Sequence, residues 1–501
     1  MSDFDAIIIG GGLGGLVAGA KLTKEGKKVL LIEQHSIPGG CATNFKRKGF
    51  TVDAGFHAID GLDQKDPKLA MLKNLNVFEN VEFLRIPEFY RFKNERIDIV
   101  IPDNTKEAIK VLTQYFPEDK KGINLYFKKI HALQKETSRF LFERKKPFVL
   151  FPLLPFLYPN LVLNVHKTLG QFLDKTIKSE DLKLVLQANL LYYHDNPNSM
   201  SIIYFSAGQA SYFNGGGYYI KGGAQKLSDY LASLITKQGG VVVFNSLATK
   251  IITQGNEVEG VDYQNSKDRE TKTCFSKTII ANMAYNNVVN LLPEENRNET
   301  FSSSESFKNA CSLISIYICF KSEIKELGSK HYSTIVFDET INCLKDVEYS
   351  SKVSYEKRNF VFVDYSQIDS GLAPKGKSSG VICTVDYLAN WENLSQEDYQ
   401  KKKEEVAQLF IKRLEKLVPG ITNEIELYEV GTPKTIKKYT LNPGGSVYGF
   451  AQTPRQSGIY RMQHKSSIKN LYFASAWANP GGGFTGAMLS GWLCASEVLK
   501  K

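Results

Sequence analysis

Three glycines near the N-terminus have the spacing of a phosphate-binding turn. Gly10, Gly12 and Gly15 form G-x-G-x-x-G, in which the first glycine makes a tight turn and the second lets the backbone approach a pyrophosphate. The third lets a helix lie close to the preceding strand. Glu33 stands 18 residues beyond Gly15, where a carboxylate can accept hydrogen bonds from ribose hydroxyls. These residues predict a dinucleotide site, and the acidic residue argues against a 2′-phosphate on the ligand.

The elements that must position these residues follow from the apolar pattern. Residues 6–10 (AIIIG) and 28–33 (KVLLIE) are short apolar runs, which is typical of parallel strands buried on both faces. Between them, apolar residues recur at helical spacing. Further strand and helix patterns occur in residues 215–290 and from 468 to the C-terminus. Because these fragments are far apart in the chain, we predict an α/β, Rossmann-like domain assembled from discontinuous segments.

Two more glycine-rich segments indicate which dinucleotide binds. Residues 38–41 (PGGC) and 49–57 (GFTVDAGFH) supply a second glycine turn and an Asp-x-Gly turn, which a long flavin needs and a nicotinamide does not. Residues 479–483 (NPGGG) lead into a helix that begins near Phe484. The unpaired N–H groups and the dipole of that helix start would stabilise negative charge on a reduced flavin ring. We therefore predict FAD as the cofactor.

Several of these segments resemble the phytoene desaturase, carotenoid isomerase and retinol saturase superfamily of FAD-dependent oxidoreductases. The matching segments are GGCATNFKRKGFTVDAGFHAI, YYIKGGAQKLSDYLASLITKQGG, KTIIANMA, TPKTIKKYTLNPGGSVYG and NLYFASAWANPGGGFTGAMLSG. Cys41 follows the paired glycines, where bacterial carotene desaturases usually have arginine. This departure makes the chain look more similar to the retinol saturase and carotenoid isomerase branch.

The resemblance implies which residues bind FAD. They are Gly10, Gly12, Leu13, Gly14, Gly15, Glu33, Gln34, Gly40, Cys41, His57, Ala58, Ala248, Asn282, Gly483, Phe484 and Thr485. The resemblance assigns no catalytic residue. His57 is the one candidate, either as a proton donor or as a ring that packs beside the flavin.

The same comparison of segments divides the chain into two domains. Residues 1–75, 215–290 and 441–501 are expected to form the FAD-binding domain. Residues 76–214 and 291–440 are expected to form a mixed α+β substrate-binding domain.

Within the second domain, residues 110–200 are predicted to be largely helical and to associate with a membrane. Residues 147–163 (PFVLFPLLPFLYPNLVL) are strongly apolar but carry four prolines, which break a regular helix and argue against a membrane-spanning one. Two interpretations remain open: a buried loop, or a segment that enters one leaflet of a bilayer. Arg144, Lys145 and Lys146 precede the segment and favour contact with anionic lipid.

The resemblance implies chemistry on a long apolar polyene, such as a carotenoid or retinoid, lying beside the flavin. Desaturation, saturation and cis-trans isomerisation all exchange a hydride with flavin N5, so the sequence does not separate them. No second G-x-G-x-x-G motif occurs after the first, so an external electron donor or acceptor is expected. One alternative is a flavin amine or other small-molecule oxidase, but the scarcity of obvious carboxylates in the predicted cavity argues against it. The other alternative is a non-catalytic lipid-binding escort similar to Rab GDP-dissociation inhibitors.

Composition narrows the partners and the compartment. The formal net charge is +10, but lysine-rich surfaces are most often only solvated, and no nucleic-acid partner is expected. The seven cysteines lack Cys-x-x-Cys or histidine spacing, so no metal site is predicted. Residues 6–10 already resemble a core strand, which leaves no space for a signal peptide before it. We therefore expect a cytoplasmic, peripheral membrane protein.

Overall fold

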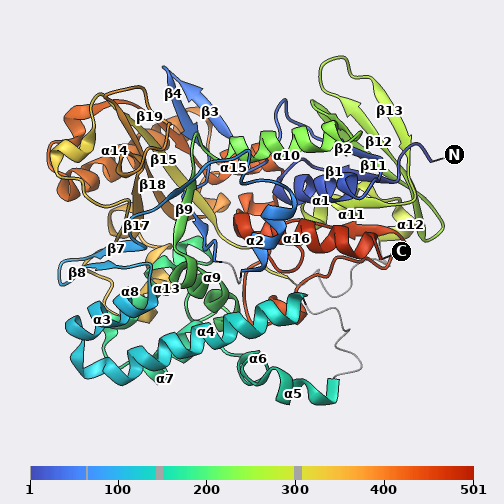
Figure 1. The fold of residues 1–501 in the computed structure, drawn as a ribbon. Helices are drawn as coiled ribbons and strands as arrows, with labels where there is room; N and C mark the ends of the chain where they lie inside the picture. The colour runs from blue at the N-terminus through green and yellow to red at the C-terminus, as the bar shows by residue number, and fades with distance from the viewer. Residues whose placement is uncertain (1, 64–65, 143–150, 298–306, 501) are drawn as a thin grey trace.

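Five parallel strands form the sheet that the glycine-rich motif predicts (Figure 1). The computed structural model describes residues 2–63, 66–142, 151–297 and 307–500. The strand order is β10-β2-β1-β14-β20, with bounds β1 (Ala6–Ile9), β2 (Val29–Ile32), β10 (Val241–Val243), β14 (Ile279–Ala281) and β20 (Leu471–Phe473). Every residue of β1 and β2 is buried, because helices and a second layer cover both faces. Segments from the start, middle and end of the chain therefore share one sheet.

Helices and a small antiparallel sheet cover this parallel sheet. Helix α1 (Leu13–Lys24) contacts both α10 (Gln225–Lys237) and α16 (Gly483–Val498). The other elements of this half are α2 (Pro67–Asn74), β11 (Ser246–Gln254), β12 (Glu257–Asn265), β13 (Thr271–Phe275), α11 (Tyr285–Leu291) and α12 (Glu294–Arg297). Both termini lie on this side of the molecule (Figure 1).

A second, seven-stranded sheet forms the other half, in the order β19-β15-β18-β17-β16-β7-β8. Its bounds are β7 (Tyr90–Lys93), β8 (Asp98–Ile101), β15 (Ser312–Phe320), β16 (Ser333–Val336), β17 (Phe360–Asp364), β18 (Ser378–Asp386) and β19 (Ile425–Gly431). Neighbouring strands are antiparallel except β7 and β16. The long helix α14 (Gln396–Leu417) covers one face with an apolar stripe that includes Phe410 and Leu414.

A helical arm lies below the two sheets in Figure 1. It consists of α3 (Thr105–Tyr115), α4 (Lys120–Phe142), α5 (Leu154–Leu157), α6 (Pro159–Asn164), α7 (Leu169–Thr176), α8 (Glu180–Gln187) and α9 (Ile202–Gly215). Helix α4 packs against α9 and α6. In the part of the chain that the structure describes, no helix is both long and apolar enough to cross a membrane.

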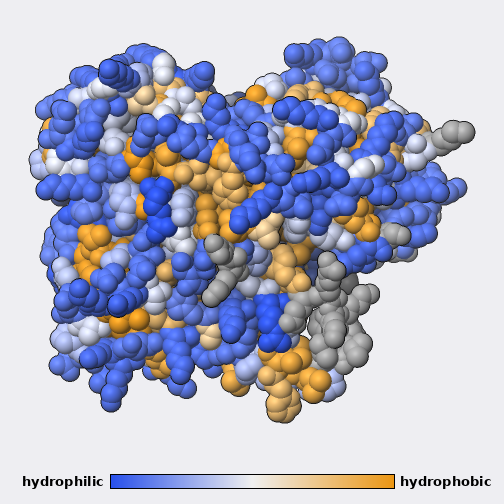
Figure 2. All heavy atoms as spheres, viewed as in Figure 1, coloured by the Kyte–Doolittle hydropathy of each residue, from blue (hydrophilic) through white to orange (hydrophobic). Residues whose placement is uncertain are grey.

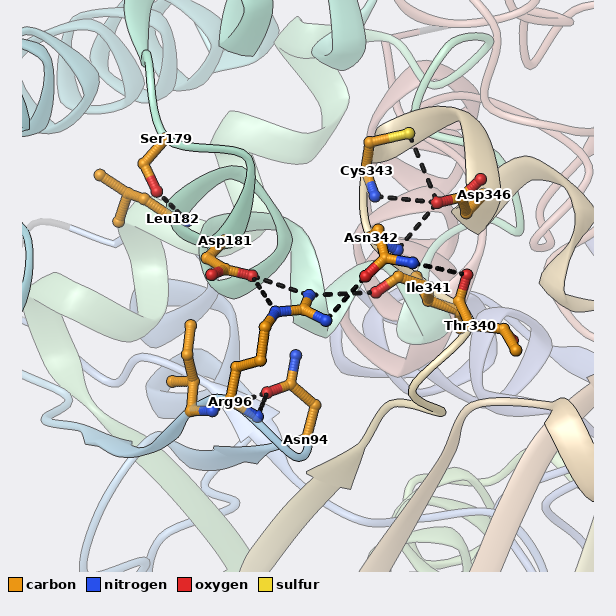
Figure 3. A network of polar contacts seen from close by, with 11 residues as sticks. Asn94, Arg96, Ser179, Asp181, Leu182, Thr340, Ile341, Asn342, Cys343 and Asp346 are labelled. Carbon is orange, nitrogen blue, oxygen red and sulfur yellow. Dashed lines mark hydrogen bonds and ion pairs between the residues drawn. The ribbon is translucent and has the colours of Figure 1, made fainter.

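Polar contacts fix the arm against the edge of the seven-stranded sheet (Figure 3). Arg96, in the turn between β7 and β8, donates from Nε and Nη2 to Asp181 Oδ1 at 3.0 and 2.8 Å. Its Nη1 donates to Asn342 Oδ1 at 2.7 Å, in the loop before α13 (Leu344–Ser350). An exposed ion pair contributes little stability alone, but one guanidinium shared by two segments sets their relative orientation.

Short elements connect the two halves across the predicted domain boundaries. Strand β6 (Phe83–Arg85) pairs with β9 (Gly217–Ile220), which also pairs with β5 (Ile59–Asp60). The hairpin of β3 (Asn44–Arg47) and β4 (Phe50–Asp53) packs against Cys319 and Tyr317 of the second sheet. The two halves therefore enclose the space between them on several sides.

Candidate functional site

A cavity of about 1890 Å³ extends between the two sheets and into the helical arm. It is larger than the roughly 300–1,000 Å³ of an ordinary small-molecule site, so it has room for a dinucleotide and a second molecule. The predicted cofactor residues that line it are Gly10, Gly12, Leu13, Gly14, Glu33, Gln34, Gly40, Cys41, His57, Ala58, Ala248, Asn282, Gly483, Phe484 and Thr485. Residues distant in the sequence are thus brought to one surface.

Gly15 is the exception among the predicted cofactor residues. It does not line the cavity, and a Cβ on it would lie 2.2 Å from the carbonyl oxygen of Gly10. The absence of a side chain therefore lets α1 pack against the end of β1, which is the spacing role that the motif also requires.

The first glycine turn ends in a helix start that is suited to an anion. Gly10 has φ 99°, and a Cβ there would lie 2.5 Å from Asn282 O, so the turn requires glycine. Helix α1 begins after Gly12 without a side-chain cap, which leaves its first N–H groups available to a pyrophosphate. The second glycine turn is adjacent, because Gly39 N donates to Gly11 O at 2.8 Å.

Glu33 is held in place at the end of β2. Its Oε2 accepts from Gly11 N at 2.6 Å and its Oε1 accepts from His35 N at 2.8 Å. The residue is 5% exposed and lines the cavity. A carboxylate offers about four acceptor positions, so these two bonds leave capacity for ribose hydroxyls.

Helix α15 (Pro433–Thr440) closes the cavity next to the end of β2, which the sequence did not predict. His35 Nε2 lies 2.5 Å from Tyr439 O, and Gln34 Nε2 donates to the same oxygen at 3.3 Å. Asn287 Nδ2 donates to Leu441 O at 2.9 Å. Residues 433–440 fell within the range assigned to the substrate-binding domain, yet they contact the dinucleotide side.

The carboxylate of Asp53 holds the Asp-x-Gly turn in place. Its carboxylate accepts from Phe56 N at 2.9 Å, Ala224 N at 2.8 Å and Tyr219 Oη at 3.1 Å. Burial raises the pKa of Asp53 to about 6, and these hydrogen bonds only partly offset that rise. The turn that carries His57 is therefore anchored to the start of α10.

His57 lies in a buried position where it is neutral near pH 7. Burial lowers the pKa of its imidazole to about 4. Nδ1 lies 3.0 Å from Tyr192 Oη, and the backbone oxygen of His57 accepts from Tyr332 Oη at 2.6 Å. Of the two roles left open for this residue, the neutral ring favours packing beside the flavin over proton donation.

The start of α16 faces the cavity directly. Gly482 provides no side-chain cap, and a Cβ on Gly483 would meet no atom within 4 Å. The ring of Phe484 lies 4.8 Å from that of Phe56. Thr485 Oγ1 donates to Asp60 Oδ1 at 2.5 Å. An uncapped helix start with open space before it fits the negative edge of a flavin.

Beyond the glycine turns the cavity is aromatic and then apolar. Its tyrosines, of which Tyr332 is buried and the others are partly buried, are Tyr192, Tyr193, Tyr204, Tyr212, Tyr332 and Tyr448, and desolvation raises the pKa of each hydroxyl. Its apolar end is formed by α4, α5 and α6, through Phe140, Leu141, Leu154, Tyr158, Leu161 and Val162. The expectation of few cavity carboxylates is wrong, because Asp60, Asp66 and Glu88 all line this space.

The short helices α5 and α6 also carry outward-facing apolar side chains. Phe156 is 82% exposed and Leu163 is 67% exposed, and these helices form the apolar cluster at the lower edge of Figure 2. Leu153 is also exposed. For the described part of residues 147–163, a buried loop is therefore wrong. Arg144, Lys145, Lys146, Phe148 and Leu150 lie outside the described residues.

The fold and the site define an FAD-dependent oxidoreductase. The sequence matches the model of the family described as flavin containing amine oxidoreductase over residues 13–499, and the chain belongs to this family. It is similar in fold to an oxidoreductase from Methanosarcina mazei (TM-score 0.65, 17% identity, covering 99% of this chain and 100% of that one). Cyclohexylamine oxidase from Brevibacterium oxydans has a TM-score of 0.63 at 14% identity, with 99% of both chains covered.

Three relatives match almost the whole chain. Prolycopene isomerase of Daucus carota is 29% identical, covering 99% of this chain and 80% of the relative. All-trans-retinol 13,14-reductase of Danio rerio is 26% identical (100% and 86%), and the lycopene-forming phytoene desaturase of Pantoea ananas is 25% identical (98% and 98%). The resemblance to the isomerase, reductase and desaturase superfamily is confirmed.

Proposed function

We propose that this enzyme acts on the carbon-carbon bonds of an apolar polyene of the carotenoid or retinoid class, by hydride exchange with bound FAD. The observation that carries the proposal is the continuous cavity of about 1890 Å³, which passes from the glycine turns through a tyrosine-lined region to apolar walls in α4–α6. The names of the relatives support the same substrate class, since they include a prolycopene isomerase and a retinol reductase.

The chain's own residues would hold the cofactor and exclude water. The helix starts at Gly12 and Gly482 would bind the pyrophosphate and the flavin edge, and Glu33 would bind the ribose. Bound FAD would supply an acceptor or donor of hydride. Neutral His57 and Tyr192 would pack against the flavin, while the apolar walls orient the polyene. Because conjugation delocalises the positive charge that hydride loss creates, no strong protein base is required.

We further propose that α5 and α6 enter one leaflet of a membrane and admit the substrate. The exposed Leu153, Phe156 and Leu163 support this, since burying each large apolar side chain contributes about 1.5–3 kcal/mol. The same helices line the cavity through Leu154, Pro155, Tyr158, Leu161 and Val162. A water-insoluble polyene would therefore pass from lipid into the cavity without crossing water. Net desaturation or saturation would also need an external electron acceptor or donor.

Amine oxidation is the second candidate. Asp60, close to the start of α16 in a region rich in tyrosine, favours it, because a carboxylate among aromatic rings can bind an ammonium group. The FAD-loaded protein should be incubated with a panel of carotenoids and retinoids, with and without dithionite, and separately with primary and secondary amines. Polyene conversion, measured by chromatography and absorption, supports the proposal. Flavin reduction by amines with no polyene conversion replaces it with the second candidate.

A further inference from the structure

Asp60 places a carboxylate on the wall of an otherwise tyrosine-lined and apolar part of the cavity. It is the last residue of β5, and its side chain is 16% exposed, toward the space that it lines. Oδ1 accepts the hydroxyl of Thr485, and Oδ2 lies 3.5 Å from Lys68 Nζ. Asp60 therefore lies next to the helix start at which the flavin ring is proposed to bind.

The charge of Asp60 is only partly compensated. Lys68 is completely buried, and its amine donates to Asp66 Oδ2 at 2.6 Å, closer than its 3.5 Å separation from Asp60. Ser211 Oγ also donates to Asp66 Oδ2, at 2.8 Å. Within the described ranges no other cation lies within 4 Å of Asp60. One lysine thus serves two carboxylates, and Asp60 is the more distant of the two.

Three tyrosines respond to this charge. Burial is the main cause that raises the pKa of each hydroxyl of Tyr193, Tyr204 and Tyr212. The proximity of Asp60 adds to the rise, directly after burial at Tyr212, after Tyr212 at Tyr193, and against the larger lowering effect of Arg461 at Tyr204. All three line the same cavity. Aromatic faces attract cations, and a carboxylate in a medium of low polarity attracts them more strongly than in water.

We propose that Asp60, together with Tyr193, Tyr204 and Tyr212, forms a site that stabilises positive charge on the polyene. The polyene carries this charge after it has lost a hydride or before it receives one. This inference rests on the proposed function, because only a substrate that loses or awaits a hydride carries that charge. It concerns electrostatic binding, and no bond to Asp60 is made or broken. It also assigns a task to a carboxylate that hydride transfer itself does not use.

The test uses non-reactive mimics of the charged chain. Pairs of isoprenoid chains of equal length differ at one position, which is a quaternary ammonium nitrogen in one chain and a quaternary carbon in the other. The charged position is moved along the chain in successive pairs. Dissociation constants for the FAD-loaded protein are measured by equilibrium dialysis, so the result does not depend on turnover. We expect the wild type to bind the charged chain about tenfold more tightly at one or two positions.

Three variants locate the effect. Asp60→Asn should abolish the preference, and it should fold, because the amide oxygen can still accept from Thr485 and Lys68 keeps Asp66. Asp66→Asn should weaken the preference, since Lys68 would then pair with Asp60 alone. Asp63→Asn, a carboxylate in the same loop but outside the cavity lining, should leave it unchanged. Flavin absorbance and thermal unfolding confirm that each variant is loaded and folded.

The outcomes separate this inference from the proposed function. The cation site is wrong if Asp60→Asn still prefers the charged chain, or if the wild type shows no such preference at any position. The proposed function stands in either case if neutral polyenes still bind and react. If neither the charged nor the neutral chain binds the wild type, both the site and the proposed substrate class are wrong. If Asp60→Asn loses its flavin, Asp66→Asn becomes the deciding variant. An unchanged preference of Asp66→Asn for the charged chain then overturns the inference.

Discussion

Gly491 of α16 and Gly14 of α1 pack backbone against backbone: a Cβ on Gly491 would lie 2.1 Å from the carbonyl oxygen of Gly14. This contact sets how closely the backbones of the two helices whose starts face the cavity approach each other. Gly491→Ala should lower the free energy of unfolding by about 1–3 kcal/mol, the usual cost of overpacking. The sign of this change is informative, because replacing glycine with alanine at an uncrowded helix position raises the free energy of unfolding by about 1 kcal/mol.

The measurement for this first prediction is denaturant unfolding together with flavin retention, both of which should fall. Gly431→Ala in β19 is a suitable control, since a Cβ there would meet Tyr317 Oη at an ordinary 3.4 Å. A more stable Gly491→Ala protein would show that the helices can separate without cost.

Gly12→Val should abolish FAD binding. The backbone of Gly12, at φ −71°, accepts a side chain, but the branches of valine would project over the uncapped N–H groups at the start of α1. Gly12→Ala should retain part of the cofactor, because its Cβ meets only Asn282 Nδ2, at 3.1 Å. Flavin absorbance relative to protein absorbance measures both, and a fully loaded Gly12→Val protein would exclude the pyrophosphate from this turn.

Glu33→Ala should weaken FAD binding by about 1–3 kcal/mol, since charge-assisted hydrogen bonds are lost. Glu33→Gln should have a smaller effect, because one oxygen remains to accept from Gly11 N or a ribose hydroxyl. The loss of flavin across a dilution series gives both affinities. Equal retention in wild type and Glu33→Ala would argue against Glu33 as the ribose ligand.

Phe156→Ser combined with Leu163→Ser should release the protein from anionic liposomes while the flavin stays bound. These side chains are 82% and 67% exposed, so their replacement should leave the core intact. Leu125→Ser, which changes a 48% exposed leucine on α4, is the matched control and should still sediment with liposomes. Unchanged sedimentation of the double variant would remove α5 and α6 as the membrane contact.

His57 should make stability depend on pH. Its folded-state pKa, about 4, lies below the ordinary 6.5, so the unfolded chain binds a proton more readily than the folded one between these values. Its contribution is therefore fully present above about pH 6.5 and is lost as the pH falls toward 4. The pKa of Asp53 is raised from 3.8 to about 6, so its contribution to stability changes with pH in the opposite direction over nearly the same range.

The pH dependences of stability from these two residues oppose each other, so a measurement on the wild type alone does not reveal either of them. The difference in unfolding free energy between wild type and His57→Asn, measured at equal flavin content, should shrink from pH 7 to pH 5. Asp53→Asn should steepen the loss of stability on acidification. A constant difference for His57→Asn over this range would mean that the ring is not buried as described.

The part of the cavity next to the glycine turns follows from the sequence more directly than the tyrosine-lined part does. Gly10, Gly12 and Glu33 obey local rules, because a turn, a strand and a helix start are encoded by neighbouring residues. Tyr439 and Asp60 could not be found in this way. Their positions depend on where α15 and β5 pack, which is settled by tertiary contacts rather than by spacing. Gly15 was assigned correctly to the motif, but only the packed structure separates contact with cofactor from contact with a strand.

The parallel sheet begins with β1 at Ala6–Ile9 and is completed by β20 at Leu471–Phe473, followed by α16 to Val498. During synthesis, the sheet that faces the cofactor cavity therefore stays unfinished until β20 and α16 have left the ribosome. A nascent or prematurely terminated product lacks one edge strand and one of the two cofactor-facing helix starts. Stable flavin retention thus reports that translation has passed α16.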